Sequence, residues 1–505
     1  MISSSVFLVE IVSLAVLAYV LISTSYNILF HPLRKYPGPV IHRITNLCMS
    51  YHDIRGKAAY HIRELHEKYG STVRIGPNEL SYIDEQAWND IYGHKSQNGT
   101  GNLPREEKRS RPEKNNTVTI LNANEADHRR LRRIQTPMFS DRAIAAQEEL
   151  VIRYCELLTS RLMERTNSSS NSIDMVLWYT YIAFDIFGEL AFGKPFNGLT
   201  SNSLDTWIQL TLLTFKDFVF WMAANQFMFP LNKILYRLSP RDSRNAWARR
   251  YELAALKISD RVIRDLNSPK MDLISHIVQY NDEKGMTEAE IQSNARILII
   301  AGSETSSSLL SGLTYLLLRN RTHLEEVTNL IRTTFPSKKD ITFLKLKKLD
   351  YLNNIIRETL RLYPPVPSGI TRRTDRGGSV ICGEVVPEYT TVSIPILTAN
   401  TSSINWADPM KFVPERWFKD ERCPEQYRSD KRNCMQPFSY GPRNCIGKNL
   451  AMSEIRMIIA HVLWNFDIEL EPDVRDWEYQ RIYKLWEKKP LHVKLYPRKN
   501  LDIFG

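Results

Sequence analysis

One long helical pattern, from residue 287 to about residue 320, constrains the fold of this chain more than any other feature. Thr287 and Glu290 have the spacing of a capping box, which marks the start of a helix. The pattern that follows is much longer than an average globular helix. We therefore expect this helix to cross a whole domain.

Helical periodicity also dominates the rest of the chain, whose 505 residues are 43% hydrophobic and can bury a large core. Short strand candidates, bounded by glycine, proline or asparagine turns, lie at residues 71–84, 379–396 and 489–497. The sequence predicts a mainly α fold with a small β portion in a single large helical domain. The polar stretches 98–116 and 164–172 are predicted to be surface loops.

The N-terminal 30 residues predict a membrane anchor. Residues 6–30 are apolar and long enough to span a bilayer as one helix, with Glu10 near the interface. Basic residues, beginning at Arg34 and Lys35, follow this run, so the positive-inside rule keeps the remaining chain in the cytosol. A buried core helix is the alternative, but the terminal position and the charge step favour an anchor. We expect an anchor at 1–30, a stiff, extended proline-rich hinge at 31–39 and a globular domain at 40–505.

Charge and cysteine content narrow the class of partner and the compartment. The formal net charge of +11 favours acidic partners: anionic lipid, an acidic redox protein or nucleic acid. The six cysteines have no CxxC pair and no disulfide-framework spacing, which indicates a reducing, cytosol-facing compartment.

The centre of the long helix is unusual for an apolar rod. The stretch AGSETSSS, residues 301–308, places Gly302, Glu304 and Thr305 among small polar residues. Gly302 and the hydroxyl groups weaken the helix locally and leave backbone groups free for water or ligand. Small-residue helix packing would explain the glycine and the serines, but it does not explain a glutamate at this position.

A constrained loop with a single cysteine precedes the last long helical pattern. Its spacing is FxxGxRxCxG, formed by Phe438, Gly441, Arg443, Cys445 and Gly447. A thiolate is stabilised at a helix N-terminus, where it can act as a nucleophile, a redox thiol or a metal ligand. Neither a nearby histidine nor a second cysteine with zinc-site spacing is present, so one metal–thiolate bond remains. An iron porphyrin, with a propionate at Arg443, fits this description better than an inert buried cysteine.

Two further motifs predict a structural clamp. In ETLR, Glu358 and Arg361 share one helix face and can pair, although an exposed pair of this kind contributes little. The proline-bounded PERW stretch, residues 414–417, supplies a second guanidinium from Arg416. A carboxylate between two guanidinium groups is structural rather than catalytic.

These motifs, in the order AGSET, ETLR, PERW and the Cys445 loop, resemble those of the cytochrome P-450 family, the haem-thiolate monooxygenases. The resemblance covers essentially the whole sequence after the anchor, and four motifs in order are far more specific than one. It implies the cytochrome P-450 fold and heme b (iron protoporphyrin IX). It also implies reductive activation of dioxygen and insertion of one oxygen atom into a C–H or C=C bond.

The resemblance also implies roles for single residues. Cys445 matches the axial thiolate ligand of the iron, in a loop that includes Phe438 and Gly441. Thr305 and Glu304 match the acid–alcohol pair that directs protons to bound dioxygen, and Glu358, Arg361 and Arg416 match the clamp behind the haem.

Basic groups are expected to meet the haem propionates. Besides Arg443, the matching positions are His128 and Arg132 in DHRRLRR, and Arg372 in GITRRT in preference to Arg373. His128 departs from the tryptophan that is commoner in the family. The other arginines of HRRLRR are expected to be solvated.

Some of these features also suit other functions. The HRRLRR patch alone would suit a nucleic-acid-binding module, but the sequence has no helix-turn-helix, zinc-finger or RNA-sheet signature. A non-catalytic, membrane-tethered haem protein would not need Glu304 and Thr305. A haem-thiolate isomerase or dehydratase that works without a reductase is the alternative among enzymes.

The resemblance implies an NADPH-dependent diflavin reductase as electron donor, docking on a basic surface around Lys448, and a location in the endoplasmic reticulum membrane.

Residues 206–231 fall where the family has its access-channel helices, and their apolar character suits a lipophilic substrate or a membrane-dipping surface. VPSGI, residues 366–370, is expected to line the distal pocket. HPLRKYPGP, HRRLRR and PERW together look like filamentous-fungal enzymes of secondary metabolism, so we expect oxidation of a terpenoid or polyketide.

Overall fold

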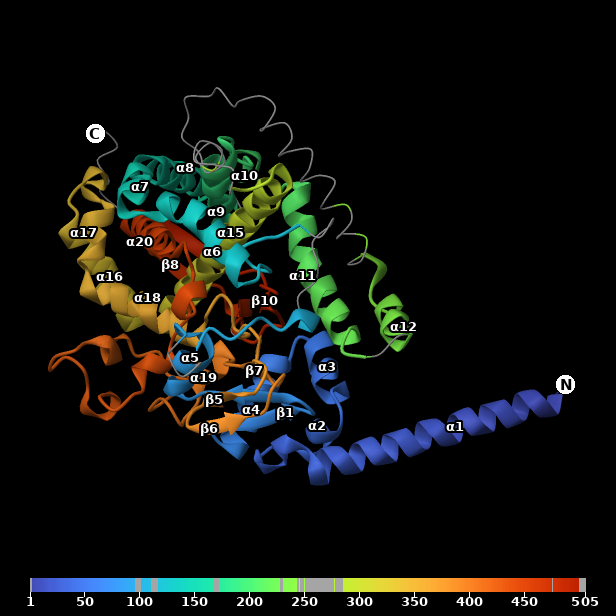
Figure 1. The fold of residues 1–505 in the computed structure, drawn as a ribbon. Coiled ribbons are helices and arrows are strands. Elements are labelled where there is room, and N and C mark those ends of the chain that lie inside the picture. The colour runs from blue at the N-terminus through green and yellow to red at the C-terminus, as the bar shows by residue number, and fades with distance from the viewer. Residues whose placement is uncertain are drawn as a thin grey trace.

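The long helix is the central element of the protein in a computed structural model (Figure 1). The structure describes residues 2–95, 101–109, 117–166, 172–227, 230–242, 245, 249, 277, 285–474 and 476–498. Helix α15 (Glu288–Arg319) begins at Thr287, whose side chain and that of Glu290 form both hydrogen bonds of the capping box. Most of its side chains beyond the first turn are buried, so the predicted domain-crossing helix is confirmed.

Other helices enclose α15 and account for most of the body. Those that pack against it include α9 (Met175–Phe192), α16 (Arg321–Thr334), α18 (Asp350–Leu362) and α20 (Lys448–Asn465). The remaining described α-helices are α1 (Ile2–Ser25), α2 (Val40–Ile44), α3 (Leu47–Ile54), α4 (Ala58–Tyr69), α5 (Glu85–Tyr92), α6 (Glu125–Gln135), α7 (Asp141–Ala146), α8 (Glu148–Thr166), α10 (Gly198–Ser201), α11 (Thr206–Ala224), α12 (Leu231–Arg237), α17 (Phe343–Lys347) and α19 (Ile396–Thr401).

Gly302 is explained by the crossing of α15 and α9. A Cβ at this position would lie 2.1 Å from the ring of Phe187, so no larger residue fits. Beside it, Ser303 Oγ donates to the Ala183 carbonyl across the same crossing at 3.2 Å. Helix α15 continues without interruption through residues 301–308, and small-residue packing accounts for Gly302.

The β portion consists of small sheets that the sequence located well. One has four strands in the order β1 (Thr72–Gly76), β2 (Glu79–Tyr82), β7 (Thr391–Ser393) and β4 (Arg372–Arg373), with only β2 and β7 parallel. A second has the order β3 (Ser172–Asp174), β11 (His492–Pro497) and β8 (Phe466–Leu470). Two hairpins pair β5 (Ser379–Ile381) with β6 (Glu384–Val386), and β9 (Ile482–Tyr483) with β10 (Leu485–Trp486). Each of the three predicted strand regions contains strands.

Helix α1 projects away from the body, as Figure 1 shows. Residues Val6–Phe30 are apolar and long enough to cross a membrane, and the body of the protein does not bury their most apolar stretch. The run meets the body at its C-terminal end, where the Arg74 guanidinium donates to the Asn27 carbonyl at 3.0 Å. The predicted hinge is not extended throughout, because Pro32–Lys35 forms a 3-10 turn in which the His31 ring accepts a hydrogen bond from the Leu33 N–H.

The predicted clamp is present and completely buried. Glu358 accepts from the Arg361 guanidinium at 2.7 and 2.9 Å and from Arg416 Nε at 3.1 Å. The Trp417 indole N–H adds a bond at 2.9 Å, and all three charged side chains are 0% exposed. Burial raises the pKa of the Glu358 carboxyl, but the charges and hydrogen bonds of the two arginines outweigh it and leave this pKa lowered. The clamp joins α18 to the 3-10 turn Pro414–Trp417.

Replacing the clamp carboxylate should destabilise the fold. Glu358→Ala leaves Arg361 buried without its anion and leaves Arg416 with only the Asp430 carboxylate, which costs about 3–5 kcal/mol of unfolding free energy. The measurement is denaturant unfolding of the full chain. The control is Glu164→Ala, which removes an exposed pair of the same i,i+3 spacing with Arg161 and should change stability by less than about 1 kcal/mol. Equal effects of the two variants would contradict the clamp.

Candidate functional site

The cysteine loop is shaped by a tight contact with helix α5. Gly441 has φ +72°, and a Cβ there would lie 2.0 Å from the Tyr92 carbonyl oxygen, so glycine is required on both counts. The Cys445 N–H donates to the Phe438 carbonyl at 2.8 Å, which closes the loop. Gly447 differs, because a Cβ there would meet only Phe139 at an ordinary 3.7 Å. Contacts within the described protein therefore do not require glycine at 447, which fits the predicted approach of a flat ligand.

Cys445 is an exposed residue just before helix α20. Desolvation by the protein atoms around its sulfur raises the pKa of the thiol, while the N–H groups of Gly447 and Lys448 and the charge of Arg132 lower this pKa by less. The N–H groups at the helix N-terminus therefore favour the thiolate, as expected, but desolvation of the sulfur outweighs them. A bound metal cation is the further contribution that would keep this sulfur deprotonated.

Positive charge converges beside this loop. Arg372 is 1% exposed, its Nη1 donates to the Leu103 carbonyl at 3.1 Å, and its Nε has no hydrogen-bond partner among the described residues. Arg443 donates to the Ala123 carbonyl at 2.9 Å. Burial, and then the charge of Arg443, lower the pKa of Arg372 to about 10 despite the neighbouring Tyr92.

Arg105 joins this cluster, and sequence reasoning missed it. Burial first, then Arg372 and Arg443, lower its pKa to about 9, and its Nε also lacks a partner among the described residues. Arg105 pairs with Arg372 in an isolated β-bridge, and Leu103 is fully buried, so this part of the predicted 98–116 surface loop is not a surface loop. Residues 96–100 and 110–116 lie outside the described residues. One feature of the sequence could have indicated a buried Arg105. Apolar Leu103 lies two residues before it, and side chains two residues apart in a strand point to the same face.

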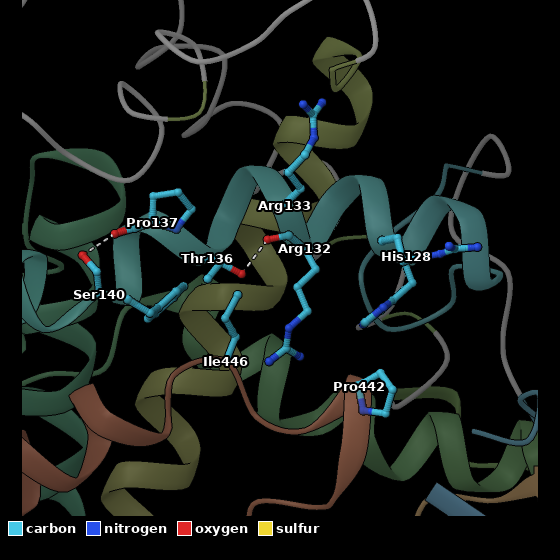
Figure 2. A pocket seen from close by; sticks show the side chains of 10 residues that line it. His128, Arg132, Arg133, Thr136, Pro137, Ser140, Pro442 and Ile446 are labelled. Carbon is cyan, nitrogen blue, oxygen red and sulfur yellow. Dashed lines mark hydrogen bonds between the residues drawn. The ribbon is translucent and has the colours of Figure 1, made fainter. Parts of the chain in front are cut away.

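Helix α6 supplies the other two predicted basic groups. Figure 2 shows His128 and Arg132 pointing toward the cysteine loop at Pro442 and Ile446, and Arg133 pointing away from it. Arg132 donates to the Asn444 carbonyl and to Asn444 Oδ1, each at 2.6 Å, so it also holds the loop. A cavity of about 570 Å³ lies between α6 and the loop. Burial, followed by the surrounding arginines, lowers the pKa of His128 to about 4, so this ring is neutral at physiological pH.

One arginine of HRRLRR is not simply solvated, in contrast to the sequence expectation. Arg130 pairs with Glu290 at 2.7 Å and with Asp127 at 2.9 Å. It therefore ties α6 to the first turn of α15. Arg129 is largely exposed, as expected.

Glu304 and Thr305 make separate contacts on α15. Thr305 Oγ1 donates to the Ala301 carbonyl one turn earlier. Glu304 is 2% exposed and pairs with Lys488 at 2.8 Å, and the Lys488 ammonium also donates to Ser307 Oγ at 2.6 Å. Glu304 Oε2 has no hydrogen-bond partner in the described part of the chain. Lys488 was not predicted, because nothing in WEKKP distinguishes it from a solvated lysine.

The side chains around the loop fit an iron porphyrin. The exposed Cys445 thiol is a single soft ligand for iron. Neither Arg105 nor Arg372 has a carboxylate partner within the described residues, and two propionates would supply the anionic charge that this cluster needs. Arg105, His128, Arg132, Arg372 and Arg443 are the groups available to hold them.

Comparison with known proteins agrees with this chemistry. The sequence profile of the family "Cytochrome P450" matches residues 36–494. The cytochrome P450 monooxygenase aclL of Aspergillus oryzae is 37% identical over 95% of this chain and 97% of its own length. The monooxygenase astA of Talaromyces wortmannii is 38% identical over 99% of both chains, and traB of Penicillium crustosum is 39% identical over 97% of this chain and 98% of its own.

Arg372 and Arg373 should differ in their effect on haem retention. Arg372 lies in the cation cluster that it forms with Arg105 and Arg443. In contrast, Arg373 stacks on Tyr389 at 5.5 Å. Arg372→Gln should weaken haem binding by about 10- to 100-fold through loss of a charged hydrogen bond, and Arg373→Gln should leave it unchanged. The rate of haem transfer to an apoprotein acceptor measures both. A larger loss of haem from Arg373→Gln would place the propionate contact at Arg373 instead and contradict the prediction.

Proposed function

We infer that this chain, which belongs to the cytochrome P450 family and is therefore a haem monooxygenase, oxidises a lipophilic intermediate of secondary metabolism. The observation that carries the assignment of the site is the exposed Cys445 thiol beside buried guanidinium groups without carboxylate partners. When bound, the haem iron supplies the activation of dioxygen. A terpenoid or polyketide scaffold is the substrate class that we propose.

The chain's own residues have distinct proposed tasks. Cys445 binds the iron, and the cation cluster orients the porphyrin through its carboxylates. Thr305 Oγ1, held by the Ala301 carbonyl, positions a hydroxyl group on α15. Lys488 keeps one oxygen of Glu304 engaged, which leaves Oε2 available to take up a proton and pass it on through Thr305. Delivery requires a side-chain rotation or a water, because the two residues make separate contacts.

Exposed apolar side chains on the side of the protein that carries α1 support the proposal of a lipophilic substrate. The exposed side chains of Leu231, Ile234 and Leu238, on and just after α12, are large and apolar. Exposed Ile41 and Leu47 lie on α2 and α3, near the body end of α1 (Figure 1). Within the predicted access region 206–231, residues 228 and 229 lie outside the described residues. We propose that this side dips into the endoplasmic reticulum membrane, with the body in the cytosol, and admits substrate from the bilayer.

A basic depression beside the cysteine loop suits an electron donor. It has a volume of about 280 Å³, and its lining includes Lys347, Arg357, Lys448 and Arg456 as well as Phe438. We propose that an acidic surface of an NADPH-dependent diflavin reductase docks here, because complementary charge accelerates association.

Charge reversal in this depression should weaken coupling to the reductase. Lys347 is exposed and lines the depression. Lys347→Glu should raise the KM for the reductase several-fold at low salt, with the difference shrinking as salt screens the charges. The control is Lys68→Glu, an exposed lysine on α4 that does not line the depression. Equal effects of the two reversals would place the reductase elsewhere.

Metabolite profiling of the producing cell with Cys445→Ala tests the function as a whole. Loss of the iron ligand should abolish one product and accumulate a compound that lacks one or more oxygen atoms. Cys382→Ala, a free cysteine on a different loop, is the matched control and should leave the profile unchanged. Accumulation of a compound with the same oxygen count would contradict the monooxygenase and favour a haem-thiolate isomerase.

A further inference from the structure

Three side chains that can bind a metal ion lie close together at the end of the body where α1 joins it, away from the elements that carry the haem loop. They are His42 on α2, Cys48 on α3 and His61 on α4, and their ligand atoms all lie within 4.8 Å of one another. Figure 1 shows α2 and α3 where helix α1 meets the body. The spacing H-x5-C-x12-H brings them together only because three successive short helices fold back on one another.

The tautomer of His42 is fixed by its surroundings. His42 is 1% exposed, and its Nδ1 lies 3.1 Å from the Ile75 carbonyl oxygen. A carbonyl can only accept, so Nδ1 carries the proton and Nε2 presents a lone pair. That lone pair points at His61 Nε2, at 3.1 Å. A backbone carbonyl on the far nitrogen is the usual outer partner of a metal-binding histidine.

Neither neutral tautomer satisfies His61 completely. If Nε2 is protonated and donates to His42, then the bare Nδ1 faces the Glu64 carboxylate at 3.7 Å. If Nδ1 carries the proton toward Glu64, two lone pairs face each other at 3.1 Å. A cation between the two Nε2 atoms resolves the conflict and makes Glu64 a favourable outer partner.

The surrounding side chains hold this geometry. The His52 ring stacks on His61 at 3.8 Å, with an interplanar angle of 7°, and so fixes the plane of the ring. Cys48 is partly buried and forms no disulfide. Two imidazole nitrogens and one sulfur select a borderline metal over Ca²⁺ or Mg²⁺.

We propose that His42 Nε2, His61 Nε2 and Cys48 Sγ bind one Zn²⁺ ion. Tetrahedral zinc takes nitrogen at about 2.0–2.1 Å and sulfur at about 2.3 Å, which is compatible with donor atoms this close together. Binding releases the Cys48 proton to solvent, and the fourth position is available to water. The ion would join α2, α3 and α4 at the base of the anchor.

Zinc stoichiometry of the full-length, haem-loaded protein tests this site. The protein in detergent is equilibrated with ZnCl₂, freed of loosely bound metal, and analysed for zinc and iron atoms. The wild type should hold one zinc per iron, and Cys48→Ser and His61→Ala should fall to background. Serine is nearly isosteric with cysteine, so Cys48→Ser removes the sulfur with little disturbance of packing. Cys382→Ser should retain one zinc, and iron content verifies that each variant folds.

Absorption at the zinc edge identifies the ligands without interference from haem. One sulfur at about 2.3 Å and nitrogens at about 2.0–2.1 Å are expected. Glu64→Gln, which weakens the outer partner of His61, should lower zinc affinity about tenfold. Zinc at background in the wild type, zinc unchanged in both ligand variants, or a coordination shell without sulfur would overturn the proposal.

Discussion

Buried positive charge is the constraint around which this protein is organised, and this charge is balanced in two different ways. Arg361 and Arg416 share the Glu358 carboxylate, so the clamp carries its own anion and is complete within the fold. Arg105 and Arg372 have no such partner in the described structure, and burial together with repulsion from neighbouring arginines lowers their pKa values. The first arrangement stabilises the scaffold, and the second leaves a site whose charge an anionic cofactor completes.

The sequence predicted those parts of the site that local patterns encode. The capping box at Thr287 located the start of α15, and the loop spacing around Cys445 located the thiol, because both depend on residues a few positions apart. Predicted strand regions also contained strands. The long apolar run at residues 6–30 is consistent with an anchor by length and composition.

Contacts between distant segments could not be predicted in this way. Arg105 reaches the cation cluster through a β-bridge to Arg372, 267 positions later in the numbering. Lys488 also meets Glu304, and Arg130 meets Glu290, although each pair is more than 150 positions apart in the sequence. The local sequence around these basic residues does not distinguish them from solvent-exposed ones. Gly302 is a further example, since the contact with Phe187 that requires glycine there comes from a helix more than 100 positions away in the sequence.

Incorporation of labelled oxygen tests the central claim most directly. The purified full-length chain, a diflavin reductase and NADPH are supplied with ¹⁸O₂ and an extract of the Cys445→Ala producing strain. The account predicts an NADPH-dependent product that contains one ¹⁸O atom for each oxygen inserted. A product formed without NADPH, or one whose new oxygen comes from water, would contradict it.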